Sequence, residues 1–316
     1  MTLRKILSSI LLLSAALCAY AQNSKSFVFQ PSWSAQAQFA GYYIAKEKGF
    51  YEEAGLDVDI VHPFASQSAE ERVAAGEADA YALPLMEAME LRSKGHPLIN
   101  IHQSSMNCSA MMISRFGNDP SKMKGAKVLV WRAGYAQIAR CFSALKRLDY
   151  NWVEAAASLN IFVSGAIDIT LAKSFNEYYQ ILQSGLVKED SEGIYRFAEN
   201  GYNIQEDGVW MREDTYRKDP QSAKAFAEAT KKGWEWVAAN PNDALDIVMA
   251  YVRRFKLPSN RVLQKLMLEE VLSLQKDPDS GEREFRLRPD MVSEASALMK
   301  EGGIITEDIT YEQIIP

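Results

Sequence analysis

Residues 33–58 read WSAQAQFAGYYIAKEKGFYEEAGLDV, and this stretch decides the fold class. Across residues 38–54 the apolar side chains recur at helical spacing, and Gly55 follows as a helix stop. Residues 56–61 then alternate apolar and polar side chains, which is typical of a half-buried strand. Because residues 26–30 also alternate, the sequence predicts a strand, a helix and a second strand in that order.

The same alternation continues along the chain. The remaining expected strands are 78–83, 98–102, 110–114, 127–131, 160–163, 167–171 and 209–212. Shorter helices are expected at 69–75, 85–93, 136–147 and 175–182, and longer ones at 223–239, 241–255, 259–274 and 288–301. Strands that alternate with helices indicate an α/β fold with mainly parallel sheets, here followed by a helical C-terminal segment.

A chain of this length exceeds one compact core, so we expect two α/β lobes. We assign residues 22–112 to the first part of lobe 1 and residues 113–208 to lobe 2. Residues 209–316 then return to lobe 1 and add the C-terminal helices. Two crossings, near residues 103–115 and 201–211, would join the lobes, and a ligand would occupy the cleft at this hinge.

The amino end has the three parts of a secretory signal. Arg4 and Lys5 give a basic start, residues 6–17 are mostly apolar, and Ala19-Tyr20-Ala21 supplies small residues for cleavage before Gln22. We therefore expect residues 1–21 to be a cleaved signal peptide and the protein to be periplasmic.

A membrane anchor and a lipid-modified cysteine are the two alternatives to this signal peptide. A membrane anchor needs roughly 20 apolar residues, which is more than this run provides. Lipid attachment at Cys18 would want a small residue before the cysteine, whereas this chain has Leu17. Cleavage without lipidation is the favoured prediction.

Charge and cysteine content exclude several classes of protein. The formal net charge is −6, and no basic stripe is present, so nucleic acid is not expected as a partner. Beyond the signal, Cys108 and Cys141 could form one disulfide in an oxidising compartment. Two buried free thiols in separate lobes are the favoured alternative.

Several short motifs occur in a recognisable order. They are residues 33–51, Gly55 to Val58, Ala78-Asp79-Ala80, Arg92 to Gly95, Gln103-Ser104, Phe175-Asn176-Glu177-Tyr178, Gly233-Trp234 and Asn240-Pro241. Together they resemble periplasmic substrate-binding proteins of the ABC importers for nitrate, sulfonate, taurine and thiamine-pyrimidine precursors. The resemblance implies a type II periplasmic-binding-protein fold, hinge closure around a small molecule, and delivery to a membrane permease with its ATPase. We expect a monomer.

The first lobe supplies several candidate ligand contacts. Trp33 follows the first strand and offers a flat indole face to a planar ligand or a cation. Gln36 and Gln38 lie at the amino end of the first helix, where they either meet the ligand or act as solvated caps. Phe39 stands beside them, and Phe64 either covers the ligand or packs.

Other candidates lie on the crossing and in the second lobe. Gln103 and Ser104 lie on the first crossing. Arg132 and Tyr135 form the strand-to-helix turn of lobe 2, which is otherwise an ordinary surface turn. Asn176 and Glu177 pair an amide with a carboxylate, a combination that binds an amino group or a ring nitrogen directionally. Their alternative role is to favour a helix start.

The ligand class follows from these residues together with the resemblance. Pyrimidine-binding members of the group commonly have asparagine and histidine where this chain has Gln36, Gln38 and Phe39. A planar, amino-bearing heterocycle, such as a thiamine-pyrimidine precursor, or a sulfonate-like compound is the expected ligand. Trp33 and Glu177 suit such a heterocycle better than nitrate.

A ligand sensor and an enzyme are the alternatives to an importer component. A protein of the same fold could instead be a periplasmic sensor that reports a bound ligand to a membrane kinase. An enzyme similar to the eukaryotic pyrimidine synthases is less favoured, because the chain has no cysteine cluster and His62, His96 and His102 have no metal-ligand spacing. We expect no enzyme activity, no cofactor and no metal.

Overall fold

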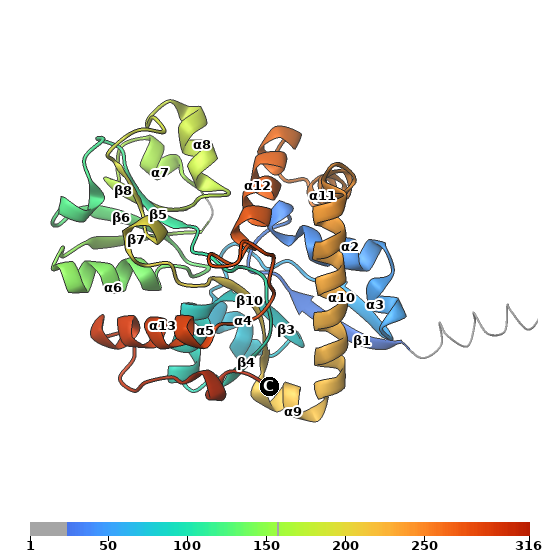
Figure 1. Cartoon of the computed structure of the whole chain (residues 1–316). Helices are drawn as coiled ribbons and strands as arrows, with labels where there is room; N and C mark the ends of the chain where they lie inside the picture. The colour runs from blue at the N-terminus through green and yellow to red at the C-terminus, as the bar shows by residue number, and fades with distance from the viewer. Residues whose placement is uncertain (1–23, 157) are drawn as a thin grey trace, which may run out of the picture.

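The computed structural model describes residues 24–156 and 158–316. Within them the chain forms two five-stranded sheets flanked by helices (Figure 1). The expected signal peptide and Cys18 lie outside the described residues. The predicted mixture of strands and helices is confirmed.

The first sheet combines four strands from the first third of the chain with one strand that returns to it later, β10. Its strands, in spatial order, are β2 (Leu56–Ile60), β1 (Lys25–Gln30), β3 (Ala80–Pro84), β10 (Asp207–Arg212) and β4 (Leu98–Gln103). β1 is parallel to β2 and β3, whereas β10 is antiparallel to β3 and β4. The connecting helices are α2 (Ala40–Glu47), α3 (Phe50–Glu53), α4 (Ala69–Ala75) and α5 (Leu85–Ser93).

The second sheet is contributed by the middle of the chain. Its spatial order is β7 (Asn151–Ala155), β6 (Lys127–Trp131), β8 (Ile169–Lys173), β5 (Ala110–Ser114) and β9 (Ile194–Arg196). β6 is parallel to β7 and β8, and β5 is antiparallel to β8 and β9. Its helices are α6 (Gln137–Lys146), α7 (Asn160–Val163) and α8 (Glu177–Ser184).

The last third of the chain is helical, as predicted. It contains α9 (Glu213–Lys218), α10 (Pro220–Ala239), α11 (Pro241–Arg254), α12 (Arg261–Leu274) and α13 (Pro289–Glu301). α10 lies along α2 beside the first sheet (Figure 1). A Cβ on Gly233 would stand 2.1 Å from the carbonyl oxygen of Gly41, so only glycine permits this approach of the two helices.

The two sheets are joined through two chain crossings and one shared core. The chain passes between the sheets between Gln103 and Ala110 and again between Arg196 and Asp207. α13 contacts both α5 and α6, and it extends a core that includes side chains of both sheets (Figure 1). The lobe boundaries given above remain predictions.

Local predictions failed at several places. Residues 160–163 form the short helix α7 and not a strand, because four apolar-rich residues do not distinguish the two periods. The strands β7 and β9 were not predicted. The helix expected across residues 38–54 is interrupted at Gly49, whose φ of 76° is left-handed. Three-residue 3₁₀ turns occur at Ala37–Phe39, Pro120–Lys122, Ala198–Asn200 and Tyr311–Gln313.

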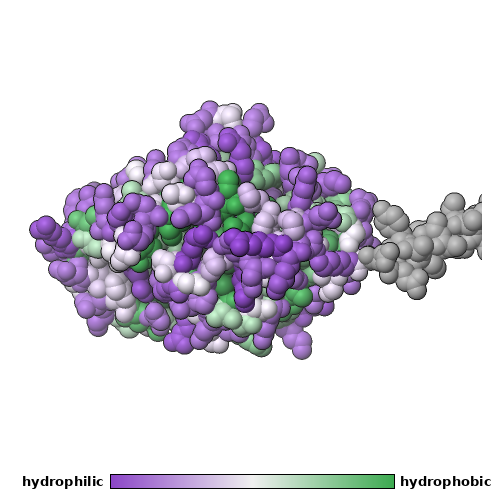
Figure 2. Space-filling view, turned by 90° about the horizontal axis from the view of Figure 1, so that it is seen from below, coloured by the Kyte–Doolittle hydropathy of each residue, from purple (hydrophilic) through white to green (hydrophobic). Residues whose placement is uncertain are grey.

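The face seen from below in Figure 2 is mostly hydrophilic, and its hydrophobic side chains form small separated groups. In residues 24–156 and 158–316, no helix is long and apolar enough to cross a membrane. Cys108 and Cys141 are both buried and free, so the alternative of a disulfide between them is wrong.

Candidate ligand-binding cleft

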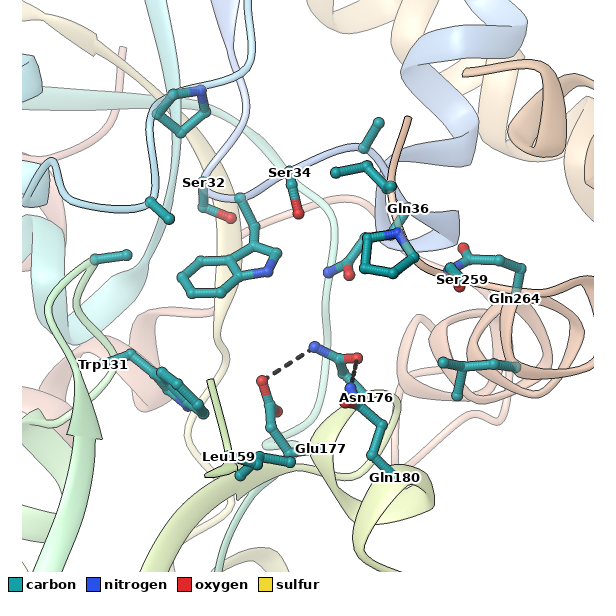
Figure 3. A pocket seen from close by; sticks show the side chains of 18 of the residues that line it. Ser32, Ser34, Gln36, Trp131, Leu159, Asn176, Glu177, Gln180, Ser259 and Gln264 are labelled. Carbon is teal, nitrogen blue, oxygen red and sulfur yellow. Dashed lines mark hydrogen bonds between the residues drawn. The ribbon is translucent and has the colours of Figure 1, made fainter. Parts of the chain in front are cut away.

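A cavity of about 310 Å³ opens between elements of the two sheets (Figure 3). The first sheet supplies the segment after β1 and the segment after β2, while the second supplies the end of β6 and the start of α8. The lining side chains discussed below are Trp33, Gln36, Phe64, Trp131, Asn176, Glu177, Gln180, Ser259 and Gln264. The carboxyl ends of strands thus meet at this cavity, where α/β proteins commonly bind ligands.

Two indoles lie at the cavity. Trp33 comes from the segment after β1, and Trp131 is the last residue of β6. Their ring centroids are 5.9 Å apart and their planes are inclined at 67°. The buried Nε1 of Trp131 has no hydrogen-bond partner among the described residues. The two rings meet edge to face, so each presents its own apolar surface to the cavity.

An acid–amide group lies across the cavity from the first-sheet residues (Figure 3). Glu177 Oε2 accepts a hydrogen bond from the backbone N–H of Lys173 at 2.9 Å, and Oε1 accepts one from Asn176 Nδ2 at 3.0 Å. Gln180 Nε2 in turn donates to Asn176 Oδ1 at 2.8 Å. Burial raises the pKa of Glu177, and these donors oppose that rise.

A second amide chain lies on the first-sheet side. Gln36 Nε2 donates to Gln38 Oε1 at 2.7 Å, and Gln38 Nε2 donates to Asp207 Oδ2 at 2.5 Å. Both glutamines line a smaller space that shares Trp33, Trp131 and Glu177 with the main cavity. The site therefore contains ordered amides on both of its walls.

A buried ion pair lies beneath this site. Lys173 Nζ, at the end of β8, is 2.6 Å from Glu206 Oε1, on the crossing that leads into β10. Glu206 also accepts hydrogen bonds from the backbone N–H and the hydroxyl of Ser109. Burial alone would lower the pKa of Lys173, but the carboxylates of Glu206 and Asp207 raise it. The pair thus links the second sheet to the crossing, and each of its two charges is compensated by the other.

The structure brings seven predicted site residues together. The main cavity or its smaller neighbour is lined by Trp33, Gln36, Gln38, Phe64, Tyr135, Asn176 and Glu177. The Phe64 side chain is 78% exposed, so it forms part of the rim. Contact of any of these residues with a ligand remains a prediction.

Four predicted site residues lie elsewhere. Phe39 is buried against Tyr42 and His62 in the first-sheet core. Gln103 is fully buried, where its amide donates to backbone carbonyls of the crossings, and the Ser104 hydroxyl lies 2.6 Å from that of Tyr42. Arg132 is exposed on its turn. Gln103 and Ser104 thus hold the crossing together.

The cavity residues that sequence reasoning missed include Trp131, Gln180, Ser259 and Gln264. Trp131 ends a strand that was predicted, so the rule that ligands lie at strand ends could have found it. Gln180 follows Asn176 by one helical turn and was detectable by that spacing. Ser259 and Gln264 come from the region of α12, and no local pattern marks them.

In the part of the chain that the structure describes, no group of three or more His, Cys, Asp and Glu side chains could hold a metal ion. His62 is engaged with the protein itself, since its Nδ1 lies 2.6 Å from the Trp33 carbonyl oxygen. The cavity therefore offers aromatic faces, amides and one carboxylate to a ligand.

Known proteins share both the sequence pattern and the fold. The formylaminopyrimidine-binding protein of Halalkalibacterium halodurans is 26% identical over 271 residues, which cover 78% of this chain and 77% of that protein. The 4-amino-5-hydroxymethyl-2-methylpyrimidine phosphate synthase of Candida albicans is 19% identical over 238 residues, which cover 70% of each chain. The ligand binding component of an ABC-type import system from Staphylococcus aureus, at 10% identity, covers 92% of this chain and 96% of its own with a TM-score of 0.66.

These likenesses confirm the predicted periplasmic-binding-protein fold and the predicted resemblance to importer binding proteins. The relatives include binding proteins as well as synthases. The sequence pattern described as NMT1/THI5 like matches residues 36–244, which is more than half of the chain. This protein belongs to the NMT1/THI5 like family.

Proposed function

We propose that this protein is the periplasmic solute-binding component of an ABC importer and that it captures a planar, amino-bearing heterocycle of the pyrimidine class. One observation carries the proposal: Trp33 and Trp131 share a single cavity with the buried carboxylate of Glu177. The formylaminopyrimidine-binding relative supports the choice of heterocycle. Delivery to a membrane permease with its ATPase belongs to the same proposal.

The cavity suits such a ligand in shape and in charge. The ring would lie against the indoles, which favour flat π systems. Glu177 has two donors of its own already in place, so its remaining lone pairs can accept N–H groups of the ligand without reorganisation. Approach of the two sheets around the ring would exclude water and strengthen these hydrogen bonds.

Binding is proposed here in place of catalysis. The cavity residues are indoles, amides, small hydroxyls and one carboxylate, and this carboxylate is held by backbone and amide donors. Nucleophilic catalysis needs a nucleophile with an adjacent base. Along the main cavity's described lining, no cysteine or histidine is present to supply such a pair.

A melting-shift screen tests this function directly. The purified protein is heated with 4-amino-5-hydroxymethyl-2-methylpyrimidine or its 5-formylaminomethyl analogue, and in parallel with nitrate or taurine. A pyrimidine at 100 times its Kd should stabilise the folded state by about 2.7 kcal/mol, which raises Tm by several degrees. Nitrate and taurine should leave Tm unchanged.

The opposite pattern would reject the proposal. Stabilisation by taurine or nitrate alone would reject the pyrimidine class. Chemical conversion of a bound pyrimidine, followed by mass spectrometry, would reject the binding-protein role and favour an enzyme.

A further inference from the structure

We infer that Asp207 is a specificity-determining positioning residue, which acts through Gln38 to turn the carbonyl oxygen of Gln36 toward the ligand. The first-sheet wall of the cavity then accepts hydrogen bonds and selects ligands that offer an N–H group on that edge. The inference rests on the proposed function, because it states which hydrogen-bonding groups the same cleft offers to the ligand.

Asp207, Gln38 and Gln36 form a hydrogen-bonded series, which we call the relay. Asp207 determines which way the two glutamine amides are turned. An ionised carboxylate only accepts hydrogen bonds, so Gln38 must present its amide nitrogen, which lies 2.5 Å from Asp207 Oδ2. Asp207 is itself fixed at the start of β10, where its backbone carbonyl accepts from the N–H groups of Ser104 and Ser105 at 2.8 and 3.0 Å. The crossing therefore anchors the carboxylate in one place.

The charge on Asp207 has support within the site. Burial raises the pKa of Asp207, and the nearby Glu206 carboxylate adds to that rise, whereas the Lys173 ammonium and the hydrogen bond from Gln38 oppose it. Lys173 is held nearby through its 2.6 Å pair with Glu206. The acceptor at the far end of the relay is thus stabilised by a fixed positive charge.

The hydrogen bond between Gln38 and Gln36 extends this orientation to the cavity. Because the Gln38 nitrogen donates to Asp207, its Oε1 faces Gln36 and accepts from Gln36 Nε2 at 2.7 Å. The Gln36 and Gln38 residues are only 7% and 5% exposed, so both amides are largely shielded from bulk water. The Gln36 Oε1 atom has no hydrogen-bond partner among residues 24–156 and 158–316, and Figure 3 shows Gln36 facing the cavity opposite Asn176 and Glu177.

The opposite wall of the cavity also offers a hydrogen-bond acceptor. Gln180 donates to Asn176, and Asn176 donates to Glu177, so this second chain also ends in an acceptor. A ligand between the walls is therefore matched when N–H groups stand on two of its edges. A ligand with an oxygen acceptor on the Gln36 edge would place oxygen against oxygen and leave a buried group unpaired, which costs about tenfold or more in affinity.

A pair of probes isolates the Gln36 edge. Calorimetric titration would compare 2,4-diaminopyrimidine with 4-amino-2-methoxypyrimidine at mildly alkaline pH, where both are uncharged. Both probes keep the 4-amino group for Glu177. At ring position 2 the diamino probe offers an N–H donor, whereas the methoxy probe offers an oxygen acceptor. The wild-type protein should prefer the diamino probe by about tenfold.

The variants then test the relay. In Asp207→Asn the new amide can either donate or accept, so Gln38 and Gln36 can both turn over, and the preference should fall to about twofold or less. Gln38→Met breaks the relay by a second route and should give the same fall. Asp79→Asn is the matched control. The Asp79 carboxylate also accepts a hydrogen bond in the first sheet, from the backbone N–H of Val28 at 2.7 Å, but Asp79 lies outside the cavity. This control should keep the wild-type preference.

The outcomes separate the two proposals. If the wild type prefers the diamino probe and both relay variants keep that preference, the inference is wrong while the proposed function stands. If the wild type prefers the methoxy probe, the inference is also wrong. If it binds neither probe, the proposed function fails and this inference fails with it.

Discussion

The Nδ1 atom of His62 lies 2.6 Å from the carbonyl oxygen of Trp33, and its Nε2 atom lies 2.9 Å from the hydroxyl of Tyr43. A neutral imidazole satisfies both contacts when Nδ1–H donates to the carbonyl and Nε2 accepts from the tyrosine. Burial lowers the pKa of His62 to about 4, although the Trp33 carbonyl favours the protonated form. His62 thus holds, in its neutral form, the segment that carries a cavity indole.

The first prediction concerns stability in acid. The unfolded pKa of His62 is 6.5 and the folded value about 4, so between these values the unfolded state binds more protons. The stability contribution is complete above pH 6.5 and is lost as pH falls toward 4, by an amount on the order of 3 kcal/mol. Urea unfolding of wild type and His62→Gln across this window should show a shallower pH dependence in the variant.

His102 contributes to the same window, because burial lowers its pKa to about 3. The His62 variant should therefore keep part of the wild-type pH dependence. Equal slopes in wild type and His62→Gln would contradict the prediction.

The second prediction concerns the indoles. Trp33→Ala and Trp131→Ala should each weaken pyrimidine binding by about tenfold or more, because stacking of a base-like ring on an aromatic side chain contributes about 1–3 kcal/mol. Trp33→Phe should keep most of the affinity. Trp236→Ala removes an indole on α10 that lies outside the cavity and contacts Lys48, so it should bind normally. Unchanged affinity in both cavity variants would exclude stacking there.

The third prediction separates binding from stability at Glu177. Glu177→Gln keeps an oxygen that can accept from the Lys173 N–H but removes the charge. Burial raises the pKa of Glu177, so its ionised form costs stability at neutral pH, whereas the glutamine NH₂ group cannot accept the hydrogen bond from Asn176. These two effects oppose each other, so the melting temperature of the variant should change little. Affinity for an amino-bearing pyrimidine should fall about tenfold or more.

Glu269→Gln, an exposed change on α12, is the control for that variant and should alter neither property. A Glu177→Gln protein with normal affinity would remove this carboxylate from the proposed site. A lower melting temperature without any loss of affinity would assign Glu177 to the start of α8 alone.

The fourth prediction tests the packing of α10 against α2. Gly233→Ala should destabilise the protein by roughly 2 kcal/mol or more, because its Cβ would meet the Gly41 carbonyl oxygen at 2.1 Å. This steric cost exceeds the gain of about 1 kcal/mol that alanine brings to a helix interior. Lys232→Ala, at the exposed neighbouring position, should be close to neutral. Chemical denaturation of both variants measures the difference.

Much of the fold was predictable because it depends on local pattern. The alternation at 56–61 gave β2, and the proline and asparagine breaks placed the helices α10 to α12 close to their observed limits. Prediction failed where a segment was too short for its period to be distinguished, as at α7, or where strand residues are only half-buried, as in β7. β9, with three residues, carries no periodic signal.

The sequence by itself determined the class of fold, the family resemblance and the acid–amide pair at Asn176 and Glu177, because each depends on local patterns or on short motifs that follow one another in order along the chain. Only the tertiary structure decided which distant side chains share the cavity. It placed Trp131 beside Trp33 and turned Phe39 into the core, and it set Asp207 at the end of the Gln36 and Gln38 relay. The physical reason is that these contacts join strand ends and crossings far apart in sequence, so no local pattern records them.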